Sequence, residues 1–289
     1  MPIATTGDLI TDAAAWQRAV AAFNVITLEH AEAIVEGAEA VGSPVILQIS
    51  ENAVAYHRGR PRPLARAAAE IAEQATVPVS LHLDHVQSTE LLYRAADCGF
   101  SSVMFDAARM PYTENLAVTR AAVVWAHARG LWLEAELGQV GGKSGAPPLD
   151  AHAPGARTDP EEARSFVAAT GVDALAVAVG TSHAMTSRDA RIDHALLARL
   201  RATVPVPLVL HGSSGVSDDD LARAVASGIT KVNIGTALNI ALTGAVREHL
   251  AQDPRGVDPR RYLAEGRDAM ARTVARLIST LSSARAHTA

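Results

Sequence analysis

The strongest constraint on the fold is a regular alternation of short apolar runs with longer amphipathic stretches. Buried parallel strands are typically short apolar runs, and the helices that cover them are typically amphipathic. The predicted strands are 22–27, 44–49, 77–83, 101–106, 131–137, 173–179, 206–211 and 230–235. The predicted helices are 12–21, 29–41, 62–75, 88–98, 112–129, 159–170, 193–202, 218–227, 236–251 and 258–284.

This pattern predicts an α/β fold, namely a (β/α)8 TIM barrel that forms a single domain over residues 1–289 with an additional C-terminal helix. Strictly alternating units imply a parallel sheet, and eight of them over about 250 residues favour a closed barrel. The alternative, an open doubly wound sheet, lacks a Gly-x-Gly-x-x-Gly signature after its first strand. The Gly- and Pro-rich segment at about 138–158 is predicted to be a mobile lid on the catalytic face. Residues 51–63 are predicted to be a second long loop on that face.

Composition makes several classes of partner improbable. The chain has 26 Lys and Arg against 31 Asp and Glu, and it has no basic stripe, so we expect no nucleic acid partner and no membrane. No apolar run approaches the roughly 18 to 20 residues that span a bilayer, and the first residues do not resemble a signal peptide. Cys98 is the only cysteine, which excludes an internal disulfide and a Cys-based zinc site. We therefore expect a cytoplasmic protein.

Polar side chains gather at the ends of the predicted strands, where a barrel of this type carries its chemistry. They are His82, Asp84, His85, Glu134, Glu136, His183, His211 and Asn233. Three of the 11 histidines, His85, His183 and His211, fall at the same end of three different strands. Three nitrogen ligands with an open coordination position are typical of a catalytic zinc site.

Structural explanations of the same residues stay open. Each histidine can cap or hydrogen-bond a loop, and Asp84 can cap the helix that follows it. Glu134 and Glu136 alternate along one strand and so share its inward face, where a carboxylate is costly unless it serves a metal or a base. One of the two can instead form an internal salt bridge with Lys231.

Two further segments predict a phosphate site. HGSSG (211–215) follows the seventh strand and NIGT (233–236) follows the eighth, which is where barrels commonly hold phosphate. Small residues let backbone N–H groups approach an anion, and the helix that starts at Thr236 directs its positive end there. A metal beside a phosphate site indicates a small phosphorylated substrate whose carbonyl or hydroxyl binds the metal, with Asp84 as proton shuttle.

Six motifs occur in order along the chain. They are LHLDH (81–85), GFSSVMFDA (99–107), EAELGQVGG (134–142), GTSH (180–183), LHGSSG (210–215) and KVNIGT (231–236). Together they resemble those of the class II, zinc-dependent ketose-bisphosphate aldolases, which include the fructose- and tagatose-bisphosphate enzymes. The resemblance implies a (β/α)8 barrel and a homodimer or homotetramer. It also implies reversible aldol cleavage of a phosphorylated ketose to dihydroxyacetone phosphate and an aldehyde.

The resemblance also assigns roles to residues. It implies one catalytic Zn²⁺ per chain, with a monovalent cation as a second candidate cofactor, and the zinc ligands His85, His183 and His211. Asp84 is the implied acid/base for the aldehyde-derived oxygen. Asp106 and Glu136 match positions that bind a second or alternative metal in some members. The implied substrate contacts are Asn24, Ser50, Ala184, Gly212, Ser213, Ser214, Asn233, Ile234, Gly235 and Thr236.

The sequence departs from the family pattern around the lid. Family members usually carry Gly-Gly-x-Glu-Asp after the fifth strand, whereas this chain has GGKSG (141–145). The missing glutamate is the residue thought to handle the proton at the donor carbon. Ala184 replaces a glycine, MTSRDARID (185–193) replaces a Tyr-Lys-Gly-type stretch, and Gly235 stands where Asp, Asn or Ala is usual.

These departures leave three functions open. The first is an aldolase that uses another base, such as Glu51 or a histidine, or another aldehyde; Glu51 can equally be a surface acid. The second is an isomerase, epimerase or lyase of a small phosphate ester that keeps the metal and phosphate sites. The third is a non-catalytic protein that binds a phosphorylated sugar.

Overall fold

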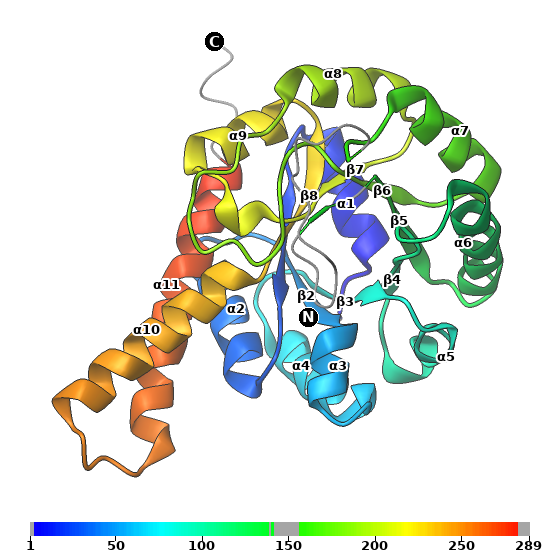
Figure 1. The fold of residues 1–289 in the computed structure, drawn as a ribbon. Helices are drawn as coiled ribbons and strands as arrows, with labels where there is room; N and C mark the ends of the chain where they lie inside the picture. Colours follow the sequence, from blue (N-terminus) through cyan, green and yellow to red (C-terminus); the bar gives the residue numbers. More distant parts are fainter. Residues whose placement is uncertain (1–2, 139, 142–155, 283–289) are drawn as a thin grey trace.

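The computed structural model describes residues 3–138, 140–141 and 156–282, which form a closed barrel of parallel strands (Figure 1). The strands are β1 (Val20–Asn24), β2 (Val45–Ser50), β3 (Val79–Val86), β4 (Ser102–Phe105), β5 (Trp132–Leu137), β6 (Ala174–Val177), β7 (Leu208–Leu210) and β8 (Ile229–Ile234). Each strand pairs with its neighbours in chain order, and β8 closes on β1 with Val20 opposite Lys231. The predicted (β/α)8 barrel is therefore confirmed.

Helices surround this barrel (Figure 1). They are α1 (Thr6–Ala15), α2 (Leu28–Ala40), α3 (Glu51–Tyr56), α4 (Pro61–Gln74), α5 (Thr89–Leu92), α6 (Tyr112–His127), α7 (Pro160–Thr170), α8 (His194–Thr203), α9 (Asp218–Ala226), α10 (Thr236–Gln252) and α11 (Pro259–Ser282). Two short 3-10 turns, η1 (Ala96–Cys98) and η2 (Ser213–Gly215), complete the set. Amphipathic periodicity explains the packing of α4, whose buried residues include Leu64, Ala65, Ala68, Ala69 and Ala72.

The strands divide the interior into two environments. Leu81 and Leu83 of β3 belong to the main apolar core between strands and helices, whereas the intervening His82 is a buried polar residue. Helix α1 packs Leu9 and Ile10 against Val20, Ala22 and Ile46, which form a second, smaller apolar cluster. Helix α1 thus covers the amino-terminal end of the barrel, where Thr6, Ser80 and Ser102 have no exposed surface; we call this end the sealed part of the barrel.

Three predicted elements differ from the structure. The predicted helix 12–21 lies earlier, at Thr6–Ala15, because the Thr5 side chain caps it by accepting from the Asp8 N–H. The predicted loop 51–63 contains α3, which begins where the Ser50 side chain accepts from the Ala53 N–H. The predicted helix 88–98 is broken into α5 and η1.

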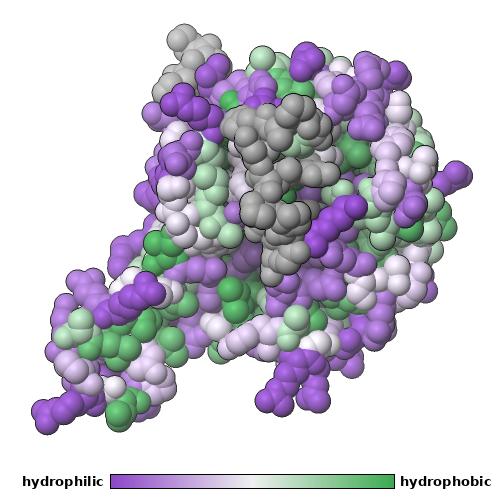
Figure 2. All heavy atoms as spheres, in the orientation of Figure 1, coloured by the Kyte–Doolittle hydropathy of each residue, from purple (hydrophilic) through white to green (hydrophobic). Residues whose placement is uncertain are grey.

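Helices α10 and α11 form a hairpin that extends away from the barrel (Figure 1). Its base is fixed because α11 crosses α2 at Gly37, where an added Cβ would lie 2.5 Å from the Ala271 carbonyl oxygen. Apolar side chains are exposed along the hairpin (Figure 2), namely Ile240, Leu250 and Val257. None of the helices in the described part of the chain combines the length and apolar character that crossing a bilayer requires.

The predicted lid at about 138–158 falls mostly outside the described residues. At the amino-terminal end of this segment, Gly141 forms a parallel bridge with Ser182. At the other end, the Thr158 hydroxyl accepts from the Ala178 N–H and donates to the Leu137 carbonyl oxygen. Both ends of the segment are thus attached to the upper rim of β5 and β6.

Candidate active site

A bulge at the end of β3 brings two neighbouring side chains to one cavity. In a regular strand Asp84 and His85 would point to opposite faces. The pairing of β3 with β4 shifts between Leu83 and Val86, and His85 has a left-handed backbone with φ of 50°. Both Asp84 and His85 consequently line the cavity at the barrel mouth.

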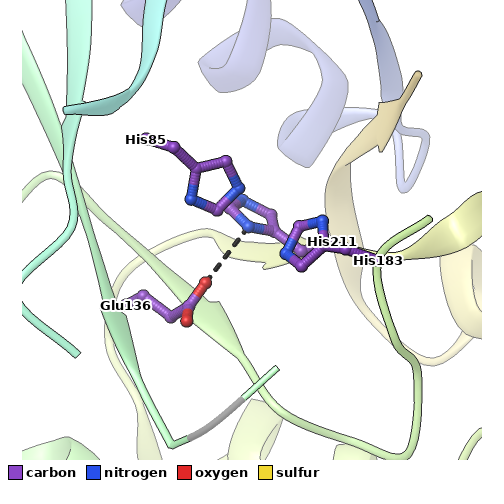
Figure 3. A group of neighbouring side chains, drawn as sticks. All are labelled: His85, Glu136, His183 and His211. Carbon is purple, nitrogen blue, oxygen red and sulfur yellow. Dashed lines mark ion pairs between the residues drawn. The ribbon is translucent and has the colours of Figure 1, made fainter. Parts of the chain in front are cut away.

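Three imidazoles and one carboxylate converge at this mouth (Figure 3). One ligand atom from each of His85, Glu136, His183 and His211 lies within 4.8 Å of the others. The rings of His85 and His183 have centroids 4.8 Å apart, and those of His85 and His211 4.7 Å apart. Such a set of nitrogen and oxygen donors can hold one divalent metal ion. The structure therefore brings the three predicted histidines together and adds Glu136 to the same group.

Carboxylates outside the cluster contact the rings of two of the histidines. The His85 Nδ1 lies 2.8 Å from Asp106 Oδ2, and the His211 Nε2 lies 2.9 Å from Glu134 Oε1. Carboxylate partners of this kind fix the orientation of metal-binding imidazoles. The backbone of His183 is held separately, because its N–H donates to the Gly141 carbonyl oxygen at 2.7 Å. Asp106 thus bonds to a cluster member and does not itself belong to the cluster.

The charges around the cluster are unequal. Burial would raise the pKa of Glu134, but the Lys231 ammonium 2.7 Å away and His211 hold it far below its usual range. Burial alone would lower the pKa of His211, yet its contacts with Glu134 and Glu136 raise it to about 9. For Asp84, burial opposes the charges of His85 and Lys231, which together lower its pKa. The Asp84 carboxylate is therefore ionised at neutral pH.

A cavity of about 570 Å³ opens above the cluster. It is lined by all but one of the predicted substrate contacts: Asn24, Ser50, Ala184, Gly212, Ser213, Ser214, Asn233, Gly235 and Thr236. Ile234 is the exception, because its side chain is 2% exposed and belongs to the apolar core. Asn233 links the cavity to the cluster, with its Nδ2 3.3 Å from Asp84 Oδ1 and 3.1 Å from His211 Nε2.

One wall of the cavity has the features of an anion cradle. Gly212 has φ of 68°, and an added Cβ would lie 2.6 Å from the Ser182 carbonyl oxygen, so only glycine fits there. Helix α10 begins beside it at Thr236, and Gly235 precedes the helix. The N-terminus of a 17-residue helix attracts anions through its N–H groups and its dipole. The Ser214 hydroxyl accepts from the Ala237 N–H and ties the two segments together.

The opposite wall contains residues that sequence reasoning did not select. Gln87 and Arg109 line it, and Arg109 is the only Lys or Arg among the described residues that line the cavity. Its position shortly after β4 was the available signal, because side chains after barrel strands reach the mouth. Glu51 also lines this wall, and its Oε2 accepts from the backbone N–H groups of Gln87 at 2.5 Å and Ser88 at 3.3 Å.

A closed (β/α)8 barrel with an imidazole-rich ligand group at the carboxyl ends of its strands defines a metal-dependent barrel enzyme. The sequence model of the family "Fructose-bisphosphate aldolase class-II" matches residues 4–286. The chain therefore belongs to the class II fructose-bisphosphate aldolase family, and it is a lyase of the aldolase type.

Solved structures agree with this assignment. The chain is 33% identical to the YdjI aldolase from Escherichia coli K12, with a TM-score of 0.82 over 97% of this chain and 98% of that one. A fructose-bisphosphate aldolase from Campylobacter jejuni is 24% identical with a TM-score of 0.82, covering 97% of this chain and 95% of that one, and it supports the fold. The family is metal-dependent and acts on phosphorylated sugars.

Proposed function

We propose that the chain catalyses reversible aldol cleavage of a phosphorylated ketose, similar to fructose or tagatose 1,6-bisphosphate, to dihydroxyacetone phosphate and an aldehyde. The observation that carries this proposal is that His85 and His183 line the same cavity as an anion cradle, with His211 buried directly beside them in one ligand cluster. Nitrogen-rich ligand sets favour zinc over magnesium or calcium, so one Zn²⁺ per chain is the proposed metal.

Asp84 and Asn233 are the residues proposed to act on the reacting atoms. When bound, the zinc ion supplies Lewis-acid polarisation of the substrate carbonyl. In cleavage, the ionised Asp84 takes the proton from the hydroxyl next to the bond that breaks. In condensation it returns this proton to the aldehyde-derived oxygen. Asn233 donates to Asp84 and holds its carboxylate toward the cavity.

The substrate phosphate is proposed to bind in the cradle made by Gly212, Ser213, Ser214, Gly235 and Thr236. Ala184, Asn24 and Ser50 line the cavity around it. Arg109 follows β4, whereas the cradle follows β7 and β8 on the other side of the barrel, so Arg109 would meet the other end of a long substrate. The two walls therefore suit a ketose with a second anionic group better than a short one.

The proton at the donor carbon needs another base, because the family's acidic pair is replaced by Ser144 and Gly145. Both positions lie outside the described residues. Glu51 lines the cavity, but its carboxylate accepts hydrogen bonds from two backbone N–H groups after β3. These bonds favour a role in holding that loop. A different aldehyde, or metal-assisted proton exchange without carbon–carbon cleavage, is the second candidate, and the altered lid sequence is what favours it.

Several expectations stay predictions. Asp106 and Glu136 remain candidates for a second metal, although Glu136 shares the first cluster and Asp106 bonds to His85. A monovalent cation, a single-domain architecture and a cytoplasmic location are likewise retained. The proposed homodimer or homotetramer is supported by the exposed apolar side chains of the hairpin of α10 and α11.

The test is a retro-aldol assay on zinc-loaded protein. Fructose and tagatose 1,6-bisphosphate are offered separately, and release of dihydroxyacetone phosphate is followed. We expect cleavage of one of them, with loss of activity in Asp84→Asn at unchanged zinc content. Absence of cleavage with one zinc per chain, together with proton exchange into dihydroxyacetone phosphate, would establish the second candidate. Absence of both reactions would contradict either enzyme function.

A further inference from the structure

A chain of buried polar side chains runs through the sealed part of the barrel to the metal cluster. It begins at Thr6 in α1 and passes through Ser102, His82, Lys231 and Glu134 before it reaches His211. Lys231, Glu134 and His82 have no exposed surface at all. Burying an ammonium and a carboxylate is costly, so a pair of this kind needs good geometry and further hydrogen bonds.

The number of protons on each group gives the direction of the hydrogen bonds that link Thr6, Ser102 and His82. The Ser102 hydroxyl donates to Thr6 Oγ1 at 2.6 Å, and the Thr6 hydroxyl donates to Ser80. A hydroxyl has one proton, so the His82 Nδ1 at 2.7 Å from Ser102 Oγ must be the donor there. The His82 Nε2 is then an acceptor, and it faces the Lys231 Nζ at 3.4 Å. His82 therefore accepts a hydrogen bond from the Lys231 ammonium.

The upper part is determined in the same way. An ammonium has only donors, and the Lys231 Nζ lies 2.7 Å from Glu134 Oε2. The other carboxylate oxygen, Oε1, lies 2.9 Å from the His211 Nε2. An unprotonated Nε2 would place two lone pairs against each other, so this nitrogen carries the proton. The Asn233 Nδ2 lies 3.1 Å from the same ring nitrogen, but it donates to Asp84 Oδ1, and a neutral amide is a weaker partner for Nε2 than the Glu134 carboxylate.

We propose that Lys231 is a positioning residue that acts through Glu134 to hold the His211 proton on Nε2 and so present Nδ1 to the metal. The Nδ1 of His211 faces the cluster, where it lies 3.2 Å from Glu136 Oε2. The inference rests on the proposed metal-dependent function, and it concerns which nitrogen of the His211 ring is left free of a proton for the metal. The arrangement at His85 is the opposite one. Its Nδ1 contacts the Asp106 carboxylate, so its Nε2 is the nitrogen available to a metal.

The substitution Glu134→Gln tests this with almost no change in shape. The Lys231 ammonium draws the amide oxygen toward itself, so the amide NH₂ group faces the His211 Nε2. That nitrogen must then accept, which moves the ring proton to Nδ1, where it opposes the metal. We expect zinc to bind roughly 10 to 100 times more weakly, the usual effect of losing such a partner.

The matched control is Glu134→Gln combined with Lys231→Met. Without the ammonium, the amide can turn its oxygen toward the His211 Nε2 and accept from it again. The double variant is expected to bind zinc at least about tenfold more tightly than the single variant, a coupling typical of residues in one hydrogen-bonded network. A residue with a merely structural role predicts the reverse, because two substitutions would damage the site more than one.

The experiment measures the zinc dissociation constant by chelator competition in the absence of substrate, so a failure of the aldolase reaction leaves it interpretable. NMR of zinc-loaded wild-type protein with ¹⁵N-labelled histidine supplies a direct readout that needs no variant to fold. The expected spectrum shows a His211 ring proton on Nε2 and none on Nδ1. A proton on Nδ1, unchanged zinc affinity in Glu134→Gln, or no recovery in the double variant would overturn the proposal. Failure of the wild-type protein to bind zinc would overturn the metal centre itself.

Discussion

The sealed interior of the barrel and its open mouth are built from the same strands but use polar residues differently. Strand β3 places His82 in the interior and Asp84 at the cavity, and β5 places Glu134 in the interior and Glu136 in the metal cluster. Glu134 hydrogen-bonds to Lys231 in the interior, whereas Asp84 lines a cavity of about 570 Å³ and Glu136 lies beside the three histidines. A step of two residues along a strand thus separates side chains of the buried network from side chains of the candidate site.

The largest expected effect at the mouth is on catalysis alone. Asp84→Asn keeps the shape and the contact with Asn233 but removes the acid/base group. We expect kcat to fall by about 10³-fold, within the usual range for general acid–base catalysis. Steady-state assays measure this, with zinc content and thermal unfolding as controls. Retention of more than about a tenth of the activity would assign proton transfer to another group.

The corresponding change in the interior is expected to act on stability. Lys231→Met removes the cation beside a fully buried Glu134 carboxylate. Breaking a buried pair from one side costs about 3 to 5 kcal/mol, so the free energy of unfolding should fall by roughly 3 kcal/mol. Denaturant titration measures it, and adding Glu134→Gln should recover part of the loss. A decrease of less than about 1 kcal/mol in the free energy of unfolding would show that the interior tolerates an unpaired carboxylate as well as a protein surface does.

Two histidines of the buried chain predict the pH dependence of the metal-free protein. Burial and Lys231 lower the pKa of His82 to about 3 in the folded protein. Below pH 6.5 this histidine is therefore protonated in the unfolded chain but still neutral in the folded protein, and the free energy of unfolding falls as the pH drops. His211 has its pKa raised to about 9, so its contribution is complete below 6.5 and is lost as the pH rises through 9.

The expected result is a stability maximum near pH 6.5, with limbs of up to about 1.4 kcal/mol per pH unit for each group. Thermal unfolding of the chelated protein from pH 5 to 9.5 measures it. His82→Gln should flatten the acid limb and leave the alkaline limb in place. A profile that stays flat on both sides would contradict the opposite behaviour of the two groups.

A smaller effect is expected on the far wall of the cavity. Arg109→Met should raise KM for a sugar bisphosphate about tenfold and leave kcat within about twofold, because a hydrogen bond to a charged group contributes about 1.5 kcal/mol. The control is Arg129→Met, since Arg129 stacks on Trp125 outside the cavity. Equal changes in KM for both variants would remove Arg109 from the substrate site.

The smallest effect concerns backbone strain beside a cluster histidine. Ala184 has φ of 57°, a conformation that glycine adopts without penalty. Ala184→Gly should stabilise the protein by about 0.5 to 1 kcal/mol. The same substitution at the exposed helical residue Ala117 should destabilise it by about 1 kcal/mol. If Ala184→Gly and Ala117→Gly shift the unfolding temperature in the same direction, the left-handed backbone at Ala184 does not strain the protein.

Most of the barrel could be predicted from the sequence because its strands are short apolar runs with a fixed spacing. Helix α1 was misplaced because apolar periodicity over residues 12–21 outweighed the cap at Thr5. Helix α3 was missed because it has six residues, too few for a periodic pattern, and its only signal was the Ser50 cap. Boundaries of this kind depend on a single hydrogen bond.

The site was predictable where position along a strand decides the chemistry, as for His85, His183 and His211. Which partner each residue takes was not predictable. Glu134 forms the internal salt bridge with Lys231 that the sequence left open, whereas Glu136 lies beside the three histidines, and only the barrel geometry shows this division. The use of Asp106 to orient His85 depends on a contact between two strands that sequence spacing does not encode.

The buried polar chain also has a consequence for the order of folding. His82 and Lys231 are separated by 149 positions, and Thr6 and Ser102 by 96. Contacts between such distant positions form late, because the entropy of closing the intervening loop must be overcome first. During synthesis, α1 emerges long before β8, which carries Lys231. Until β8 is available, the earlier strands have open edges and unpaired polar side chains. The contact of Lys231 with Glu134, and through it the orientation of His211, therefore forms only when the last strand closes the ring.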